Sequence, residues 1–209
     1  MSNLVAFGCS ITYGHGLPDC FSPPSGPGPT PSNLAWPSLL GKKLEKSMVV
    51  NNADPGASNL QILWKILNYK FQPEDMCVVH WSYFDRLDVV RLDLDSSTTH
   101  RLELEDFDKN FLSRPGYSNH NAIRNFLMIH HAALFLEDKG IPYFFLDRIS
   151  LHAGNKFPEH LKPKGYDNTQ FDQYFKIDLA LDNAHPGIKS QEKIANYIHS
   201  KLTQEMKKN

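Results

Sequence analysis

The chain has 209 residues, of which 41% are hydrophobic and 22% are charged, and its formal net charge is -1. This composition is typical of an ordered globular protein and excludes a largely disordered chain, and the length fits a single domain over residues 1–209. Because basic residues are not in excess, nothing favours a nucleic-acid partner.

Short apolar runs alternate with helical patterns along the chain. The runs are almost continuously apolar, as in strands that are covered on both faces of a parallel sheet. In chain order, the predicted strands are Leu4–Phe7, Met48–Val50, Met76–Trp81 and Pro142–Leu146. A fifth strand is expected from either Phe175–Ala180 or Ile149–His152, and the sequence leaves these two alternatives open.

Apolar residues at helical spacing fill the segments between the predicted strands. Ser58 can cap one of these helices, and Gly140 followed by Pro142 ends another. In chain order, the predicted helices are Ser32–Lys46, a helix that runs from Ser58 past Leu67, Asn119–Lys139 and Ile188–Met206. The alternation predicts an α/β fold, a three-layer α/β/α sandwich around a parallel sheet of about five strands.

Two segments show no regular period and are predicted to be loop insertions. The first, at about 15–31, holds six prolines and directly follows the first strand, so we expect an ordered surface loop there. The second, at about 91–117, is charged and irregular, and we expect a solvated insertion rather than a binding patch.

The N-terminus and the cysteines bear on the compartment. The opening MSNLVAFGCS lacks the basic and long apolar regions of a secretory signal, and no stretch approaches the ~18 apolar residues that span a bilayer. Three cysteines, Cys9, Cys20 and Cys77, are too few for a disulfide framework and suit a reducing environment. We therefore expect a soluble, cytoplasmic protein with no membrane partner.

Ser10 is the first residue that points to chemistry. It lies between Gly8 and Gly14, where the first predicted strand ends. Ligand sites of open α/β sheets gather at the carboxyl ends of strands, and backbone N–H groups at a helix start can stabilise an oxyanion. Ser10 is therefore a candidate nucleophile, and the alternative is that it only caps a helix.

A serine hydroxyl needs a base, and the segment before the last helix can supply one. His185 precedes Pro186, which disfavours helical backbone angles at the histidine. Asp182, three residues earlier, can accept a hydrogen bond from Nδ1 of the ring and leave Nε2 for Ser10. The alternative is an ordinary cap and turn at the start of a helix.

The loop after the second strand is the third candidate element. Gly56 can direct its backbone N–H into a site, and the side-chain amide of Asn59 can donate a hydrogen bond. Taken alone, this segment is equally consistent with an ordinary loop between a strand and a helix.

Together, the three elements resemble the motifs of the SGNH hydrolase family, also called GDSL esterases. The family's Gly-Asp-Ser motif matches Gly8–Ser10, its second motif centres on a glycine that matches Gly56, and its last motif, Asp-x-x-His-Pro, matches Asp182–Pro186. The resemblance implies a flavodoxin-like sheet of five parallel strands. It also implies that Ser10 attacks the substrate, that His185 transfers protons and that Asp182 orients His185.

The resemblance further implies an oxyanion hole made by the N–H groups of Ser10 and Gly56 and by an asparagine side chain. The family asparagine follows the third strand, but the corresponding segment, residues 81–86, contains none. Ser82 is the nearest donor there, and Asn59 is a possible substitute from the neighbouring loop. Loss of one oxyanion donor costs about 10²–10³ in rate if nothing replaces it. Cys9, which stands where the family has aspartate, is a rival nucleophile, but Ser10 occupies the motif position.

Three residues near the expected site are candidates for substrate binding: Trp81, Tyr83 and Arg86. Arg86 can meet a carboxylate or a sugar hydroxyl. His130 and His131 are adjacent on a predicted helix and diverge by about 100°, so we expect no metal site, and the motifs call for no cofactor.

The leading hypothesis is a serine esterase that hydrolyses a small acyl ester through an acyl-serine intermediate. By analogy with the family, the substrate class is a small molecule or a carbohydrate O-acetyl ester. The alternatives are an acyltransferase that uses the same three residues and a non-catalytic binding module on the same fold. The oligomeric state is not predicted.

Overall fold

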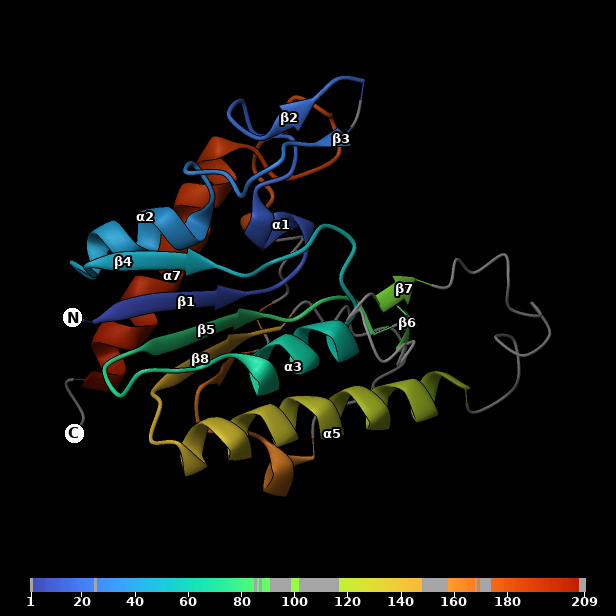
Figure 1. Ribbon diagram of the computed structural model, residues 1–209, viewed down its shortest axis with the longest axis vertical. Coiled ribbons are helices and arrows are strands. Elements are labelled where there is room, and N and C mark those ends of the chain that lie inside the picture. The colour runs from blue at the N-terminus through green and yellow to red at the C-terminus, as the bar shows by residue number, and fades with distance from the viewer. Residues whose placement is uncertain are drawn as a thin grey trace.

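The computed structural model describes residues 2–24, 26–84, 86, 88–90, 99–101, 117–147, 158–167, 169 and 174–206. Its centre is a five-stranded parallel sheet in the order β4-β1-β5-β8-β9 (Figure 1). The strands are β1 (Asn3–Phe7), β4 (Met48–Asn51), β5 (Met76–His80), β8 (Tyr143–Leu146) and β9 (Tyr166–Asp167). This confirms the predicted parallel sheet and the four strands predicted from apolar runs.

The fifth strand differs from the prediction. Phe175–Ala180 forms no strand of the sheet; Leu179 makes only an isolated antiparallel bridge with Pro186. The alternative, 149–152, lies outside the described residues. The fifth strand is β9, whose Asp167 accepts hydrogen bonds from Tyr197 at 2.8 Å and pairs with Lys201 at 3.1 Å. The sequence did not predict β9, because a strand of only two residues has no apolar run that would mark it.

Helices cover both faces of the sheet (Figure 1). On one face α2 (Trp36–Lys43) packs against α7 (Ile188–Met206), and on the other α3 (Asn59–Asn68) packs against α5 (Tyr117–Asp138). The described residues also include the short helical turns α1 (Ser10–Tyr13) and η2 (Glu159–Leu161). The predicted three-layer sandwich is therefore confirmed. The helix α2 begins four residues later than predicted, after turns that end at Ala35.

The alternation of strand side chains produces two separate cores. In β1, Val5 and Phe7 point to the layer of α3 and α5, whereas Leu4 and Ala6 point to the layer of α2 and α7. All four side chains are essentially excluded from solvent. Burial on both faces explains why the strands are continuous apolar runs.

The predicted insertions are described in part. Residues 15–31 contain an antiparallel pair, β2 (Phe21–Ser22) and β3 (Gly26–Pro27), so this loop has regular structure of its own. Of the insertion at about 91–117, the structure describes β7 (Thr99–Arg101), which pairs with β6 (Asp88–Val90), and the first residue of α5. The rest of it lies outside the described residues.

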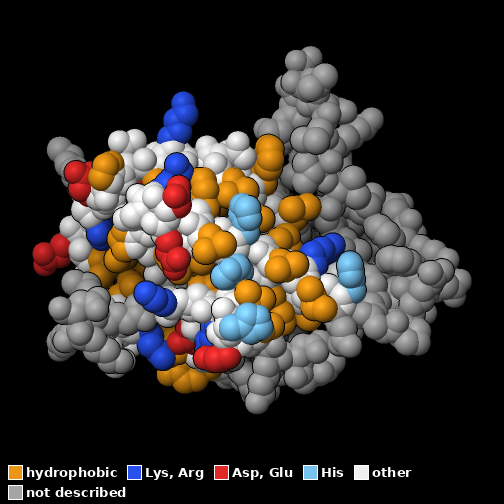
Figure 2. Space-filling model, turned by 90° about the horizontal axis from the view of Figure 1, so that it is seen from below, with side chains coloured by type: hydrophobic (Ala, Val, Ile, Leu, Met, Phe, Trp, Pro, Cys, Tyr) orange, Lys and Arg blue, Asp and Glu red, His pale blue; other side chains and the backbone are white. Residues whose placement is uncertain are grey.

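The outer face of α5 carries exposed apolar side chains. Ile123, Leu127 and Leu134 are more than half exposed, at a spacing that places them on one side of the helix. Figure 2 shows hydrophobic side chains and histidines gathered on this face. No helix in the described part of the chain is long and apolar enough to cross a membrane. All three cysteines are free and buried.

The loop that leads into α7 is held by Asp178. Its carboxylate accepts hydrogen bonds from the amides of Lys189 and Ser190, at 3.0 and 2.8 Å, and from the Ser190 hydroxyl at 2.5 Å. These amides belong to the first turn of the helix, where the N–H groups find no acceptor within the helix itself. Burial raises the pKa of Asp178, but the hydrogen bonds from Ser190 and Lys189 outweigh it, so the pKa lies below its ordinary value.

We expect Asp178→Ala to lower the free energy of unfolding by about 1–2 kcal/mol at neutral pH, because α7 loses its cap. A carboxyl whose pKa is lowered in the folded state stabilises the fold above its unfolded pKa of about 3.9. That stability is lost as the pH falls through the folded pKa. Urea denaturation at about pH 7 and about pH 3 measures the free energy of unfolding. The difference in this free energy between variant and wild type should be smaller at about pH 3.

The matched control is Asp138→Ala, at the exposed end of α5, which should change stability by less than about 0.5 kcal/mol. The charge of Asp178 would have no capping role if Asp178→Ala lowered the free energy of unfolding equally at both pH values.

Candidate active site

Ser10 is the first residue of α1, and only Gly8 and Cys9 separate it from the strand β1. Gly8 makes the sharp turn between them possible: a Cβ there would lie 2.2 Å from Thr12 Oγ1 and 3.0 Å from the carbonyl oxygen of His80. The helix ends after one turn at Gly14, which has a φ of 85° and donates its N–H to the Ser10 carbonyl. The serine is 5% exposed, at the carboxyl edge of the sheet.

His185 contacts both Ser10 and Asp182. Its Nε2 lies 2.9 Å from Ser10 Oγ, and its Nδ1 lies 2.5 Å from Asp182 Oδ2. Because an ionised carboxylate only accepts hydrogen bonds, Nδ1 carries the hydrogen and Nε2 accepts from the Ser10 hydroxyl. A serine hydroxyl bonded to an imidazole that a carboxylate orients is an arrangement that activates a nucleophile. The structure thus brings together the three residues selected from the sequence.

The carboxylate of Asp182 is held by its own loop. Its Oδ1 accepts hydrogen bonds from the amides of Ala184 and His185, each at 3.0 Å. Asn183 has a φ of 55°, a conformation that asparagine tolerates better than most residues. Burial raises the pKa of Asp182, but the hydrogen bonds from His185 and Ala184 outweigh burial and lower the pKa below its ordinary value. The carboxyl is therefore ionised at neutral pH.

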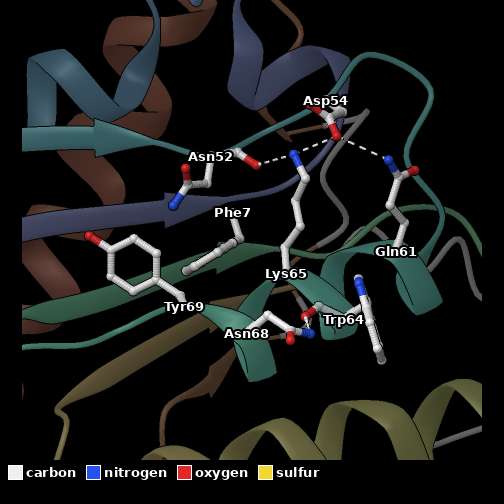
Figure 3. Close-up of a pocket in the computed structure, with 8 residues that line it drawn as sticks. All are labelled: Phe7, Asn52, Asp54, Gln61, Trp64, Lys65, Asn68 and Tyr69. Carbon is white, nitrogen blue, oxygen red and sulfur yellow. Dashed lines mark hydrogen bonds and ion pairs between the residues drawn. The ribbon is translucent and has the colours of Figure 1, made fainter. Parts of the chain in front are cut away.

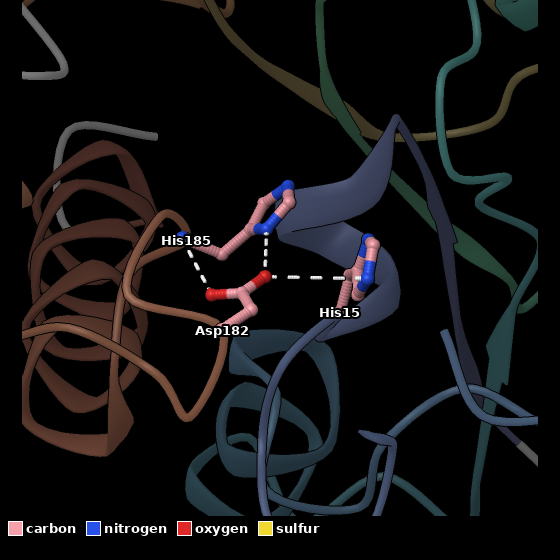
Figure 4. Close-up of side chains that lie close together, drawn as sticks. All are labelled: His15, Asp182 and His185. Carbon is pink, nitrogen blue, oxygen red and sulfur yellow. Dashed lines mark hydrogen bonds and ion pairs between the residues drawn. The ribbon is translucent and has the colours of Figure 1, made fainter. Parts of the chain in front are cut away.

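His15 is a residue of this site that the sequence did not single out. Its ring stacks on the ring of His185, with centroids 4.5 Å apart and an interplanar angle of 28°. Its Nε2 lies 4.0 Å from Asp182 Oδ2 (Figure 4). The available signal was its place directly after Gly14. In the described residues, His15, Asp182 and His185 also bring one potential metal-ligand atom each to within 4.8 Å of one another. The hydrogen bond between His185 and Asp182 already occupies His185 Nδ1 and Asp182 Oδ2.

The loop of Gly56 lies beside the nucleophile motif. The amide of Asp54 donates to the Gly8 carbonyl at 3.2 Å, which ties this loop to the end of β1. Gly56 has a φ of 86°, so the turn that it makes favours glycine. Both loops follow neighbouring parallel strands, β4 and β1, and so lie at the same edge of the sheet.

Asn59 does not serve as the substitute oxyanion donor expected from the sequence. Its two amide hydrogens go to the Ser82 carbonyl at 3.1 Å and to Asn125 Oδ1 at 2.7 Å, while its Oδ1 accepts from the Ser82 amide at 2.6 Å. The side chain is 1% exposed. Asn59 is instead a buried link between α3, α5 and the loop after β5.

Ser82 and Arg86 also bond within the protein. Arg86 Nη1 donates to Ser82 Oγ at 2.9 Å and to the Ala57 carbonyl at 3.1 Å, which joins the loops after β5 and β4. The Arg86 guanidinium lies 5.3 Å from the centroid of the half-buried Tyr83 ring. Ser82 is fully buried, and the donor role of its hydroxyl stays a prediction.

Trp81 lies in the core rather than on a pocket wall, contrary to its predicted role in substrate binding. It is 0% exposed and meets Phe145 edge to face at 5.4 Å. It directly follows β5, and its amide donates to the Leu146 carbonyl at 2.9 Å, so the sheet pattern directs it inward.

A pocket of about 290 Å³ lies elsewhere, between α3, the end of β1 and the loop after β4 (Figure 3). Lys65 crosses it to pair with Asp54 and donates to the Asn52 carbonyl at 3.1 Å, and Gln61 donates to Asp54 at 3.0 Å. Its polar groups are thus largely paired with one another. The full lining is Phe7, Asn52, Asp54, Gln61, Trp64, Lys65, Asn68 and Tyr69, which includes neither Ser10 nor His185.

No protein-family model and no curated protein sequence matches the chain. Solved structures do. An acetyl xylan esterase, Est2A, from the rumen bacterium Butyrivibrio proteoclasticus matches with a TM-score of 0.59 and 11% identity, over 98% of this chain and 64% of that chain. This chain therefore spans less than two thirds of the length of that enzyme.

Two further structures align over a larger share of their own length. A carbohydrate esterase described as having divergent catalytic and non-catalytic binding functions has a TM-score of 0.60 and 13% identity, over 97% of this chain and 68% of that chain. The esterase EstA from Pseudoalteromonas sp. has a TM-score of 0.51 and 10% identity, over 100% of this chain and 98% of that chain. The resemblance to SGNH hydrolases is thus confirmed at the level of the fold.

We expect Asn59→Ala to lower the free energy of unfolding by about 1–3 kcal/mol, because the Ser82 amide and Asn125 Oδ1 lose a buried partner. Urea denaturation measures this. Asn68→Ala, on the exposed last turn of the same helix, is the control and should change stability by less than about 0.5 kcal/mol. Equal effects of the two substitutions would refute the structural role of Asn59.

Proposed function

We propose that the chain is a serine esterase that hydrolyses a small acyl ester through an acyl-serine intermediate on Ser10. The observation that carries this proposal is the pair of hydrogen bonds that links Ser10, His185 and Asp182 across 175 positions of the sequence. Two residues so distant in sequence meet in this geometry only because the fold brings α1 and the loop before α7 together. The shared fold with esterases supports the proposal.

In the proposed reaction, Ser10 Oγ attacks the acyl carbon while His185 Nε2 takes the hydroxyl proton. Asp182 keeps the ring in the required tautomer and stabilises the imidazolium that forms. The imidazolium then gives its proton to the departing alcohol. A water molecule, deprotonated by the same nitrogen, attacks the acyl-serine and releases the acid.

The oxyanion of each tetrahedral intermediate needs hydrogen-bond donors. We assign this role to the backbone N–H groups of Ser10 and Gly56, which belong to loops that the Asp54–Gly8 hydrogen bond ties together. Backbone donors suffice for many acyl-transfer sites and cost no reorganisation during the reaction.

The proposed substrate class is an O-acetyl ester of a carbohydrate. This finer assignment is supported by analogy, since two of the structures with the same fold are an acetyl xylan esterase and a carbohydrate esterase. Such a substrate needs no cofactor, because the serine and the imidazole supply both the nucleophile and the proton transfer.

We expect Ser10→Ala to lower turnover of p-nitrophenyl acetate by about 10³-fold or more, because the variant lacks the hydroxyl that bonds His185 Nε2. A fluorophosphonate probe should label wild type at Ser10 and leave this variant unlabelled. Phosphonate is a reasonable probe, since the esterase EstA of the same fold was solved with monoethylphosphonate as inhibitor.

The control for the serine experiment is Cys9→Ala, which removes the rival nucleophile. Cys9 is 0% exposed and packs in the core beneath α3, so this variant should keep most of its turnover and its labelling. Labelling that survives in Ser10→Ala but is lost in Cys9→Ala would reject the assignment.

Activity should fall as the pH is lowered from about 8 to about 5, because a protonated imidazole cannot accept the serine proton. The lowered pKa of Asp182 keeps its carboxyl ionised through this range, so protonation of Asp182 does not cause the decline. The measurement is kcat/KM for p-nitrophenyl acetate against pH, at constant ionic strength. A flat profile would exclude His185 as the base.

A further inference from the structure

We propose that His15 is a positioning residue that holds the ring of His185 in line with Ser10. The proposal rests on the proposed function, since it gives His15 a task in the same reaction. The motivating observation is the stack of the two imidazole rings, at 4.5 Å and 28°. No known motif drew attention to His15; its role follows from where the turn after α1 places it.

The turn that carries His15 is anchored to the nucleophile itself. The amides of Gly14 and His15 both donate to the Ser10 carbonyl, each at 3.0 Å. Gly14 takes the left-handed conformation that ends α1, and the next residue therefore leaves the helix at a fixed angle. The backbone of His15 is thus fixed relative to Ser10 by hydrogen bonds to the nucleophile's own carbonyl.

The ring of His185 needs such a support. The hydrogen bond from Nδ1 to Asp182 sets the distance between the two groups, but one hydrogen bond does not by itself fix the tilt of the ring plane. A change of tilt moves Nε2 away from Ser10 Oγ. A flat ring against one face of the imidazole removes this freedom, and misplacement of about 1 Å can cost about 10²-fold in rate.

The next residue supports the carboxylate by close packing. A Cβ on Gly16 would lie 2.7 Å from Asp182 Cγ and 2.8 Å from each of its oxygens. The Leu181 amide donates to the Gly16 carbonyl at 2.9 Å, which fixes the two segments against each other. The turn Gly14–Gly16 therefore contacts both members of the His185–Asp182 pair, on which the orientation of Nε2 depends.

The distance between His15 and Asp182 favours positioning over a direct exchange of protons. His15 Nε2 lies 4.0 Å from Asp182 Oδ2, which is too long for a hydrogen bond. The carboxylate keeps its short bond to His185 Nδ1 at 2.5 Å instead. The two imidazoles are therefore not equivalent. His185 bonds Asp182 and Ser10, whereas His15 packs against the face of the His185 ring. Figure 4 shows the two rings beside Asp182.

The first test compares His15→Ala with His15→Phe on p-nitrophenyl acetate. The alanine removes the stacking surface, and we expect kcat to fall about 10-fold with KM changed less than about twofold. The phenyl ring of His15→Phe restores a flat surface and carries no ionisable group, so this variant should keep most of the wild-type kcat. Equal losses in both variants, or a loss confined to KM, would overturn the positioning role.

A second readout does not depend on hydrolysis. The proton on His185 Nδ1 should give a low-field resonance in the proton NMR spectrum, because it is shared with Asp182. We expect the resonance to persist in wild type and in His15→Phe and to be broadened by exchange with water in His15→Ala. An unchanged resonance in the alanine variant would overturn the proposal. If wild type gives the resonance but hydrolyses no ester, the proposed function fails and this comparison still decides the role of His15.

Gly16→Ala tests the contact with the carboxylate, and Gly140→Ala is its matched control. Both glycines have a left-handed φ, 84° and 65°, so both substitutions strain the backbone. A Cβ at Gly140 meets nothing within 4 Å, whereas one at Gly16 meets Asp182. We expect only Gly16→Ala to shift or abolish the Nδ1 resonance. Identical spectra of the two variants would contradict the role given to this turn.

Discussion

The geometry of the site depends on one constraint, that parallel strands end at the same edge of a sheet. Ser10 follows β1, the loop of Gly56 follows β4, and Ser82 follows β5, so three segments distant in sequence arrive side by side. The loop before α7 completes the group from the other end of the chain with His185. The hydrogen bond between Ser10 and His185 forms because α7 packs on one face of the sheet and the loop before it reaches α1.

Buried polar side chains hold the loops that this edge brings together. Asn59 and Arg86 connect the loops after β4 and β5, and Asp178 secures the start of α7. Each bonds backbone groups that would otherwise be buried without a partner, which is costly in a low-dielectric interior. Because of these links, the side-chain amide of Asn59, an oxyanion donor expected from the sequence, is occupied in the folded protein. The same links hold in place the segments that surround the site.

Prediction from the sequence succeeded where a residue's environment has a local signature. The strands β1, β4, β5 and β8 are short apolar runs because both of their faces are buried, and α7 follows its apolar period from Ile188 to Met206. Prediction failed for β9, a two-residue strand whose Asp167 is held by Tyr197 and Lys201 of a distant helix. It also failed for Trp81 and Asn59, whose neighbours come from β8 and α5.

By itself, the sequence determined the layer architecture and the identity of the Ser10, Asp182 and His185 motifs, since hydrophobic period, glycine turns and the Asp-x-x-His spacing are local properties of the chain. Only the tertiary structure decided that the serine and the imidazole meet at 2.9 Å and that His15 stacks on His185. It also decided that the amide of Asn59 is used within the core. The reason is that a side chain's partners are set by contacts across the fold, and these have no periodic trace in the sequence.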